Sequence, residues 1–146
     1  MYFGWMKGSN GMKELTVDAV VSNIAVITEF VDSELEAMGC PIKVQFQIDV
    51  AIDELFGNIA HYAYKDGAGK ATVRLESRQD PSGVVITFID EGEPFNPLES
   101  DDPDVTLSAD ERPIGGLGIF MVKKTMDSMD YEYTDNKNIL TIRKNI

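Results

Sequence analysis

Residues 54–61 read ELFGNIAH, and this stretch decides how the rest of the chain is interpreted. It lies in a segment, residues 43–64, whose apolar residues recur at helical spacing, so we predict a helix there. Residues four apart lie one above the other on a helix, so Glu54 and Asn58 share one face, and His61 extends that face by one turn. The polar face is narrow and the helix is otherwise apolar, which favours the wall of a pocket.

The residue types on this face suit phosphate chemistry. Asn58 offers a neutral amide oxygen that suits Mg²⁺ as a ligand, and Glu54 could accept a proton from an attacking hydroxyl or water. His61 or Lys65 could contact phosphate, although a single histidine is more often a structural hydrogen-bonding residue. Taken alone, the same spacing is typical of a solvated helix face, so the interpretation depends on two further segments.

The second segment begins where an apolar strand ends. Residues 84–89 are almost entirely apolar, and Asp90 follows them directly. A carboxylate at the end of a buried strand accepts hydrogen bonds. The exocyclic amine of adenine is a suitable donor, and a hydrogen bond from it to this carboxylate would favour adenine over guanine. Gly92 would let the backbone approach a flat base closely, and residues 94–97 give a stiff apolar rim. For this segment alone, an acidic turn after a strand is the alternative.

The third segment, Gly115-Gly116-Leu117-Gly118, opens the last predicted helix. Glycine-rich backbone at a helix start presents free N–H groups and the positive end of the helix dipole, which bind anions without basic side chains. Arg112 precedes it and could contact phosphate or a partner protein. The spacing is neither that of a P-loop nor that of a dinucleotide fold. An ordinary glycine-rich helix start is the alternative, but the three segments in this order predict one nucleotide pocket.

The remaining pattern predicts one domain over residues 12–146, preceded by residues 1–11, which we interpret as a leader, either a tag or a disordered extension. Periodicity predicts strands over residues 13–17, 71–77, 84–89, 130–134 and 139–142, and helices over residues 18–38, 43–64 and 115–129. We therefore expect a two-layer α/β (α+β) sandwich, in which three helices cover one face of a mixed, mainly antiparallel sheet. The polar stretch 90–113 is long for a compact domain and is typical of an active-site lid.

Composition narrows the classes of partner. The chain has 146 residues and a formal net charge of -12, which argues against binding to duplex nucleic acid or to an anionic membrane. No apolar run reaches the roughly 18 residues of a membrane span. An acidic protein that binds an anion needs a local positive site or a metal ion. The single cysteine, Cys40, cannot form an internal disulfide, which fits a cytoplasmic protein.

Together these residues resemble the GHKL superfamily of ATPases and kinases. Glu54 and Asn58 look like its N box, residues 90–92 resemble its first glycine box, and residues 115–118 resemble its second. The likeness covers nearly all of the chain from Met12 onward.

Within that superfamily, the chain is similar to the anti-sigma-factor serine/threonine kinases. Its short length and the stretches 60–64 and 111–119 are typical of that branch. The residues that follow the first glycine box, Glu93-Pro94-Phe95, are a variant of the pattern, which leaves the physiological partner open.

The resemblance implies a Bergerat-type fold that binds ATP and Mg²⁺. It implies that Glu54 is the catalytic base, that Asn58 ligates Mg²⁺, and that Asp90 binds adenine with Gly92 packed near the base. Residues 98–113 would form the ATP lid. Gly116 and Gly118 would help to hold the phosphates, within a cofactor-binding set that also includes His61, Arg112, Gly115 and Leu117.

The leading function that the resemblance implies is transfer of the γ-phosphoryl group of ATP to a serine of a small STAS-type anti-anti-sigma protein. Such kinases act in partner-switching circuits, where they also sequester a sigma factor, and they are often homodimers. The alternative is a nucleotide-sensing module whose ATP state controls partner docking with little phosphotransfer. A detached histidine kinase domain is a weaker interpretation, because the chain has no helical hairpin bearing an acceptor histidine.

Overall fold

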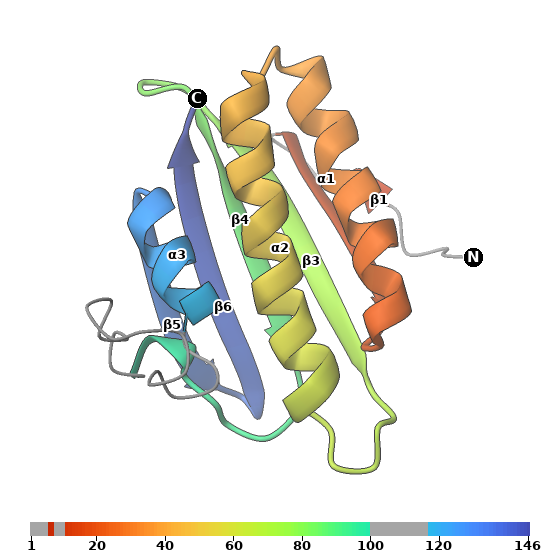
Figure 1. Ribbon diagram of the computed structural model, residues 1–146. Coiled ribbons are helices and arrows are strands. Elements are labelled where there is room, and N and C mark those ends of the chain that lie inside the picture. Colours follow the sequence, from red (N-terminus) through yellow and green to blue (C-terminus); the bar gives the residue numbers. More distant parts are fainter. Residues whose placement is uncertain (1–5, 8–10, 100–116) are drawn as a thin grey trace.

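The computed structural model describes residues 6–7, 11–99 and 117–146. The described strands form one six-stranded sheet in the order β1-β2-β3-β4-β6-β5. Figure 1 shows the helices on one face of this sheet, which confirms the predicted two-layer architecture. The strands are β1 Met6–Lys7, β2 Met12–Asp18, β3 Lys70–Arg78, β4 Gly83–Asp90, β5 Ser128–Thr134 and β6 Lys137–Asn145.

Two features of the sheet differ from the prediction. Every described pair of neighbouring strands is antiparallel, so the expected mixed character is not found among the described strands. In addition, β1 lies inside the stretch interpreted as a leader, and its Met6 pairs with Glu14 of β2. A strand of two residues is too short to show alternation, so its pairing with β2 could not be recognised from periodicity.

Three α-helices were expected, and the described residues contain α1 Ile24–Ala37, α2 Ile42–Tyr62 and α3 Leu117–Thr125, with short 3₁₀ turns η2 Val21–Asn23 and η3 Pro97–Glu99. The first helix begins at Ile24 rather than Asp18, because Asp18 still pairs with Lys70 in the sheet. Gly39, at a φ of 73°, follows its last turn, as is common after helices. None of the helices described here combines the length and apolar character that crossing a membrane requires.

The last helix is shorter than predicted. It ends at Thr125 instead of Met129, because Ser128 already pairs with Arg143 at the start of β5. The N–H of Asp127 donates to the carbonyl of Arg143 at 2.9 Å, which starts this pairing. Hydrogen bonds to a distant strand therefore override the local helical periodicity.

The core lies between the helices and the inner face of the sheet. Alternate strand residues point into it, and α2 packs its apolar side on β4. Burying one large apolar side chain contributes about 1.5 to 3 kcal/mol, so this packing sets the position of α2. The polar side and the C-terminal end of α2 are then placed beside the end of β4. The buried residues that make this contact include Leu55 and Phe56 from α2, Val73 and Leu75 from β3, Ile86 and Phe88 from β4, and Leu140 and Ile142 from β6.

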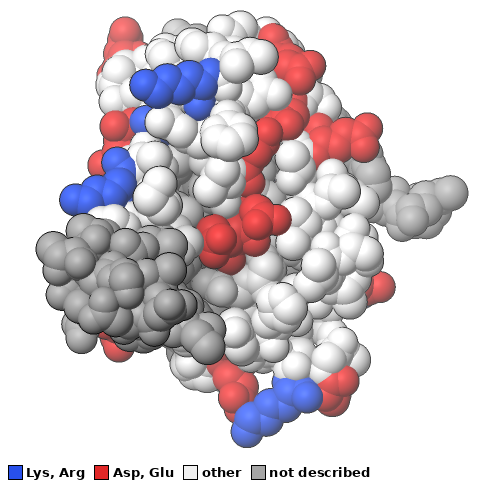
Figure 2. Space-filling view, in the orientation of Figure 1, with Lys and Arg blue, Asp and Glu red and all other residues white. Residues whose placement is uncertain are grey.

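Two carboxyl groups meet between α1 and α2. Atom Oδ1 of Asp32 and atom Oδ1 of Asp49 are both buried, and neither has a hydrogen-bond donor among the described residues. Burial, then a hydrogen bond with Asp32 and the negative charges of Asp32 and Glu36, raises the pKa of Asp49 to about 8. A bond between two carboxyl groups needs a proton, so the pair shares one near neutral pH. Figure 2 shows acidic side chains gathered on this helical face, where Glu29 and Asp53 line an open groove.

This pair makes the stability of the protein depend on pH. Because the folded-state pKa of Asp49 is raised, its contribution is complete below the unfolded value of 3.8 and is lost as the pH rises through about 8. We expect Asp49→Asn, which resembles the protonated form, to raise the free energy of unfolding by about 1 kcal/mol or more at about pH 9 and by clearly less at about pH 5. Urea unfolding at both pH values measures this, with Asp135→Asn, in the exposed turn between β5 and β6, as control. An equal effect of Asp49→Asn at both pH values would contradict the shared proton.

Candidate functional site

A pocket opens between the C-terminal half of α2 and the ends of β4 and β6. The space between its walls, counted together with the open solvent at its mouth, is about 430 Å³. Apolar walls surround a few polar groups, as is usual for sites that bind a flat organic ring. The lining residues are Leu55, Asn58, Ile59, Tyr62, Ala63, Phe88, Asp90, Glu93, Phe95, Pro97, Tyr131, Asn138 and Leu140.

Asp90 is a buried carboxyl group of this pocket, and only 5% of the residue is exposed. Its Oδ1 accepts hydrogen bonds from the backbone N–H of Gly92 and from Nδ2 of Asn138, both at 2.9 Å. Burial raises the pKa of Asp90, whereas these two hydrogen bonds lower it. Both bonds from the described residues end on Oδ1, so Oδ2 is left to accept a hydrogen bond from a ligand.

Gly92 lies where the chain after β4 passes the end of α2. A Cβ atom at this position would lie 2.2 Å from the backbone oxygen of Ala63. The N–H of Glu93 donates to the same oxygen at 2.8 Å, which holds the two segments together. Glycine is therefore needed here because the loop passes so close to the end of α2. The expected close approach of Gly92 to a base stays a prediction.

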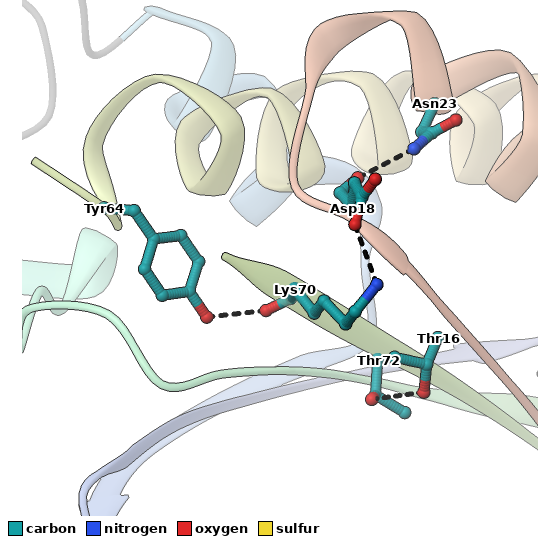
Figure 3. A network of polar contacts seen from close by, with 6 residues as sticks. All are labelled: Thr16, Asp18, Asn23, Tyr64, Lys70 and Thr72. Carbon is teal, nitrogen blue, oxygen red and sulfur yellow. Dashed lines mark hydrogen bonds and ion pairs between the residues drawn. The ribbon is translucent and has the colours of Figure 1, made fainter. Parts of the chain in front are cut away.

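Tyr64 ties the same region to the sheet. Its hydroxyl donates to the backbone oxygen of Lys70 at 2.6 Å and accepts from the N–H of Glu91 at 2.8 Å. Figure 3 shows Tyr64 reaching the backbone of Lys70, whose amino group extends to Asp18, 2.8 Å away. In the same view Asn23 donates to the backbone oxygen of Asp18. The Tyr64 hydroxyl thus connects the loop that follows Asp90 to the start of β3.

Glu54 from α2 meets Gly118 from α3. A Cβ atom on Gly118 would lie 2.0 Å from Oε2 of Glu54, so the carboxyl group lies directly against the helix start. Burial, followed by the negative charge of Asp53, raises the pKa of Glu54. One turn further along α2, Asn58 lines the pocket that ends on Asp90. Segments that are distant in the sequence therefore meet around one site.

Two predicted contact residues lie at the margin of this site. His61 is exposed, its ring is 5.9 Å from the ring of Tyr62, and it is not among the residues that line the pocket. Lys65 pairs with Glu93 at 3.1 Å in an exposed ion pair. Contact of His61 or Lys65 with phosphate therefore stays a prediction.

Several predicted residues lie outside the described part of the chain. These are Arg112, Gly115, Gly116 and most of the predicted lid, residues 98–113. Leu117 is described only as the first residue of α3, and residues 97–99 form η3.

Sequence analysis missed Asn138, which is 6% exposed and bonded to Asp90. Residues 135–138 lie between two predicted strands, but only Asp135 and Asn136 have positive φ, at 53° and 62°. Two consecutive residues of this kind are typical of a tight two-residue hairpin turn. That turn places Asn138 in β6, directly opposite Asp90. Recognising the Asp-Asn pair as the whole turn could have revealed the contact.

Comparison with known proteins agrees with this geometry. Residues 17–144 match the family described as histidine kinase-like ATPase domain. The chain is 27% identical over 100 residues to serine/threonine-protein kinase BtrW of Bordetella bronchiseptica (strain RB50), covering 68% of this chain and 70% of that protein. It is 24% identical over 134 residues to serine-protein kinase RsbW of Bacillus mycoides (strain KBAB4), covering 87% of this chain and 81% of that protein.

The close approach at Gly92 gives a prediction about stability. We expect Gly92→Ala to lower the free energy of unfolding by about 1 to 3 kcal/mol, because its methyl group meets backbone atoms that cannot rotate away. Gly57→Ala is the matched control: the nearest atom to its Cβ would be 4.0 Å away, and alanine favours the interior of α2. Urea unfolding of both variants measures the difference. If Gly92→Ala were as stable as the wild type, the described path of this loop would be wrong.

Proposed function

This chain belongs to the family of histidine kinase-like ATPase domains, and we propose that it is a cytoplasmic ATP-dependent protein serine kinase of the anti-sigma-factor type. Its substrate would be a serine of a small STAS-type antagonist protein, in a circuit that controls a sigma factor. The relatives named as serine or serine/threonine kinases support the activity. The observation that carries the proposal is the meeting of Glu54 with Gly118 beside a pocket that ends on Asp90.

The adenine end of the pocket fits the base. Asp90 presents an acceptor oxygen, which suits the exocyclic amine, and the surrounding walls are apolar. Asp90 is only 5% exposed, and a hydrogen bond formed in such a buried place is stronger than one in water.

The phosphate end fits a magnesium ion that is held largely by the nucleotide. Among the described residues, no group of three or more acidic, histidine or cysteine side chains could form a complete metal site. Mg²⁺ is usually held by one or two protein ligands, together with phosphate oxygens and water, and Asn58 would supply such a ligand. The ion, when bound, neutralises charge on the phosphates.

Glu54 would take the proton from the serine hydroxyl that attacks the γ-phosphate. A general base works best when its pKa lies near the working pH, and burial beside Asp53 moves the pKa of Glu54 in that direction. Its contact with Gly118 keeps the carboxyl group at the start of α3, beside the predicted phosphate site.

Nucleotide binding is tested by thermal shift. We expect ADP or ATP with Mg²⁺ to raise the melting temperature by several degrees, since ligand at about 100 times its Kd adds about 2.7 kcal/mol. Asn58→Ala should lose most of the Mg²⁺-dependent part, whereas Asn145→Ala, at the exposed end of β6, should behave as the wild type. GTP should give a smaller shift than ATP. If no nucleotide shifts the wild type, the likeness extends to the fold alone.

Catalysis is tested with Glu54→Gln. We expect phosphotransfer to STAS-domain proteins, measured as a mass increase of one phosphate, to fall by about 100-fold or more, while ATP affinity changes little. Asp53→Asn is the matched control: it should keep activity but move the acid limb of the pH–rate profile to lower pH, because the negative charge of Asp53 raises the pKa of Glu54. Loss of ATP binding in Glu54→Gln would contradict the role of base. Tight partner binding by the wild type without phosphorylation would favour the nucleotide-sensing module instead.

A further inference from the structure

Asn138 is a buried amide at the base end of the pocket. It lies in β6, opposite Asp90 in the register of the sheet, and only 6% of it is exposed. All of its side-chain polar atoms have partners: Oδ1 accepts from two groups, and Nδ2 donates to Asp90 and to the backbone oxygen of Glu93. An asparagine this fully bonded holds its surroundings in one arrangement.

The orientation of this amide is set by backbone groups whose roles as hydrogen-bond donor or acceptor are fixed. The backbone N–H of Phe95, 3.1 Å from Oδ1, can only donate, so the atom that faces it must be the oxygen. The backbone oxygen of Glu93, 2.8 Å from Nδ2, can only accept, so the atom that faces it must be the nitrogen. The hydroxyl of Tyr131 adds a second donor to Oδ1. The amide nitrogen of Asn138 is therefore directed at Asp90.

This orientation determines what Asp90 can offer to a ligand. Its Oδ1 receives two N–H groups, from Asn138 and Gly92, and donors of this kind favour the ionised carboxylate. The remaining oxygen, Oδ2, is then an acceptor without a proton. An acceptor there pairs with the 6-amino group of adenine and opposes the 6-oxo group of guanine or hypoxanthine.

We propose that Asn138 is a specificity-determining positioning residue, which acts through Asp90 to make the pocket select 6-aminopurine over 6-oxopurine nucleotides. The inference rests on the proposed function, because it assumes that the purine is read at Asp90. It adds that the group facing position 6 of the purine is a hydrogen-bond acceptor, and it names Asn138 as the residue that fixes this. Tyr131 supports the role by holding the oxygen end of the amide away from Asp90.

The same arrangement has a consequence for pH dependence. Burial raises the pKa of Asp90, and the bond from Asn138 is the larger of the two effects that lower it. The other titratable groups around Asp90 are Tyr64 at the end of α2, Tyr131 in β5, and Glu91 and Glu93 in the following loop, while β3 places the neutral Ala71 opposite it. Without the amide of Asn138, Asp90 takes up a proton at higher pH, and its role as acceptor is lost there.

The test compares ADP with inosine diphosphate, which carries the same phosphates and differs in the 6-position of the ring. Calorimetric titration in Mg²⁺ between about pH 5 and about pH 9 gives both affinities for the wild type, Asn138→Leu, Tyr131→Phe and Thr141→Val. Thr141 is on the same strand and does not line the pocket, so it serves as the matched control.

We expect the wild type and Thr141→Val to prefer ADP. In Asn138→Leu the ratio of the two affinities should fall about tenfold or more, since the carboxylate loses a donor that keeps it ionised. The loss of ADP affinity on acidification should also move to higher pH. Tyr131→Phe should change the ratio in the same direction by less.

Equal weakening of both nucleotides in Asn138→Leu, with an unchanged ratio and pH profile, would show a merely structural role and overturn the inference. If Asn138→Leu does not fold, Tyr131→Phe decides the question, and an unchanged ratio in that variant overturns the inference. If the wild type binds neither nucleotide, the proposed function fails first, and that result is seen without any variant.

Discussion

Asp90 brings a negative charge into the interior of the protein, and a buried carboxylate is costly unless donors surround it. The local architecture supplies those donors. Gly92 turns its backbone N–H back onto the carboxylate, and Asn138 reaches it from the next strand. The turn at Gly92 in turn requires the end of α2 to lie close by, where Ala63 accepts the N–H of Glu93. The groups that donate hydrogen bonds to Asp90 therefore also shape this end of the pocket.

The second constraint is that α2 contributes both to the core and to the candidate site. One side of this helix is buried against the sheet through residues such as Leu55 and Phe56, and the other presents Glu54 and Asn58. Because the buried side is closely packed, the polar side has little freedom to shift.

The acidic side chains on the helical face in Figure 2 affect how an anionic ligand can approach. A triphosphate approaching an acidic surface is repelled unless backbone dipoles and a bound cation neutralise it, which agrees with an amide rather than a carboxylate at position 58.

The sequence allowed prediction of those features that depend on local pattern. The helix α2 and the strands β3 and β4 follow from periodicity, and the structure confirms all three. Features that depend on distant partners could not be predicted. The end of α3 is decided by pairing with Arg143, and the reason for Gly92 is the backbone of Ala63. Asn138 falls just outside the predicted strand 139–142. Only the register of the sheet shows that it lies opposite Asp90.

Among the described residues, the pKa of three carboxyl groups is raised, with burial as the largest cause each time: Asp49, Glu54 and Asp90. Their neighbours give each a different outcome. Asp90 has two N–H donors, so it can remain an ionised acceptor despite its burial. Asp49 faces another carboxyl group, so the pair holds a proton, and this makes stability depend on pH. Glu54 has neither compensation: among the effects on its pKa, burial and the charge of Asp53 both raise it. A carboxyl group left in that state is suited to taking a proton from a hydroxyl. Under the proposed function, the same physical cause would therefore serve recognition at Asp90 and basicity at Glu54.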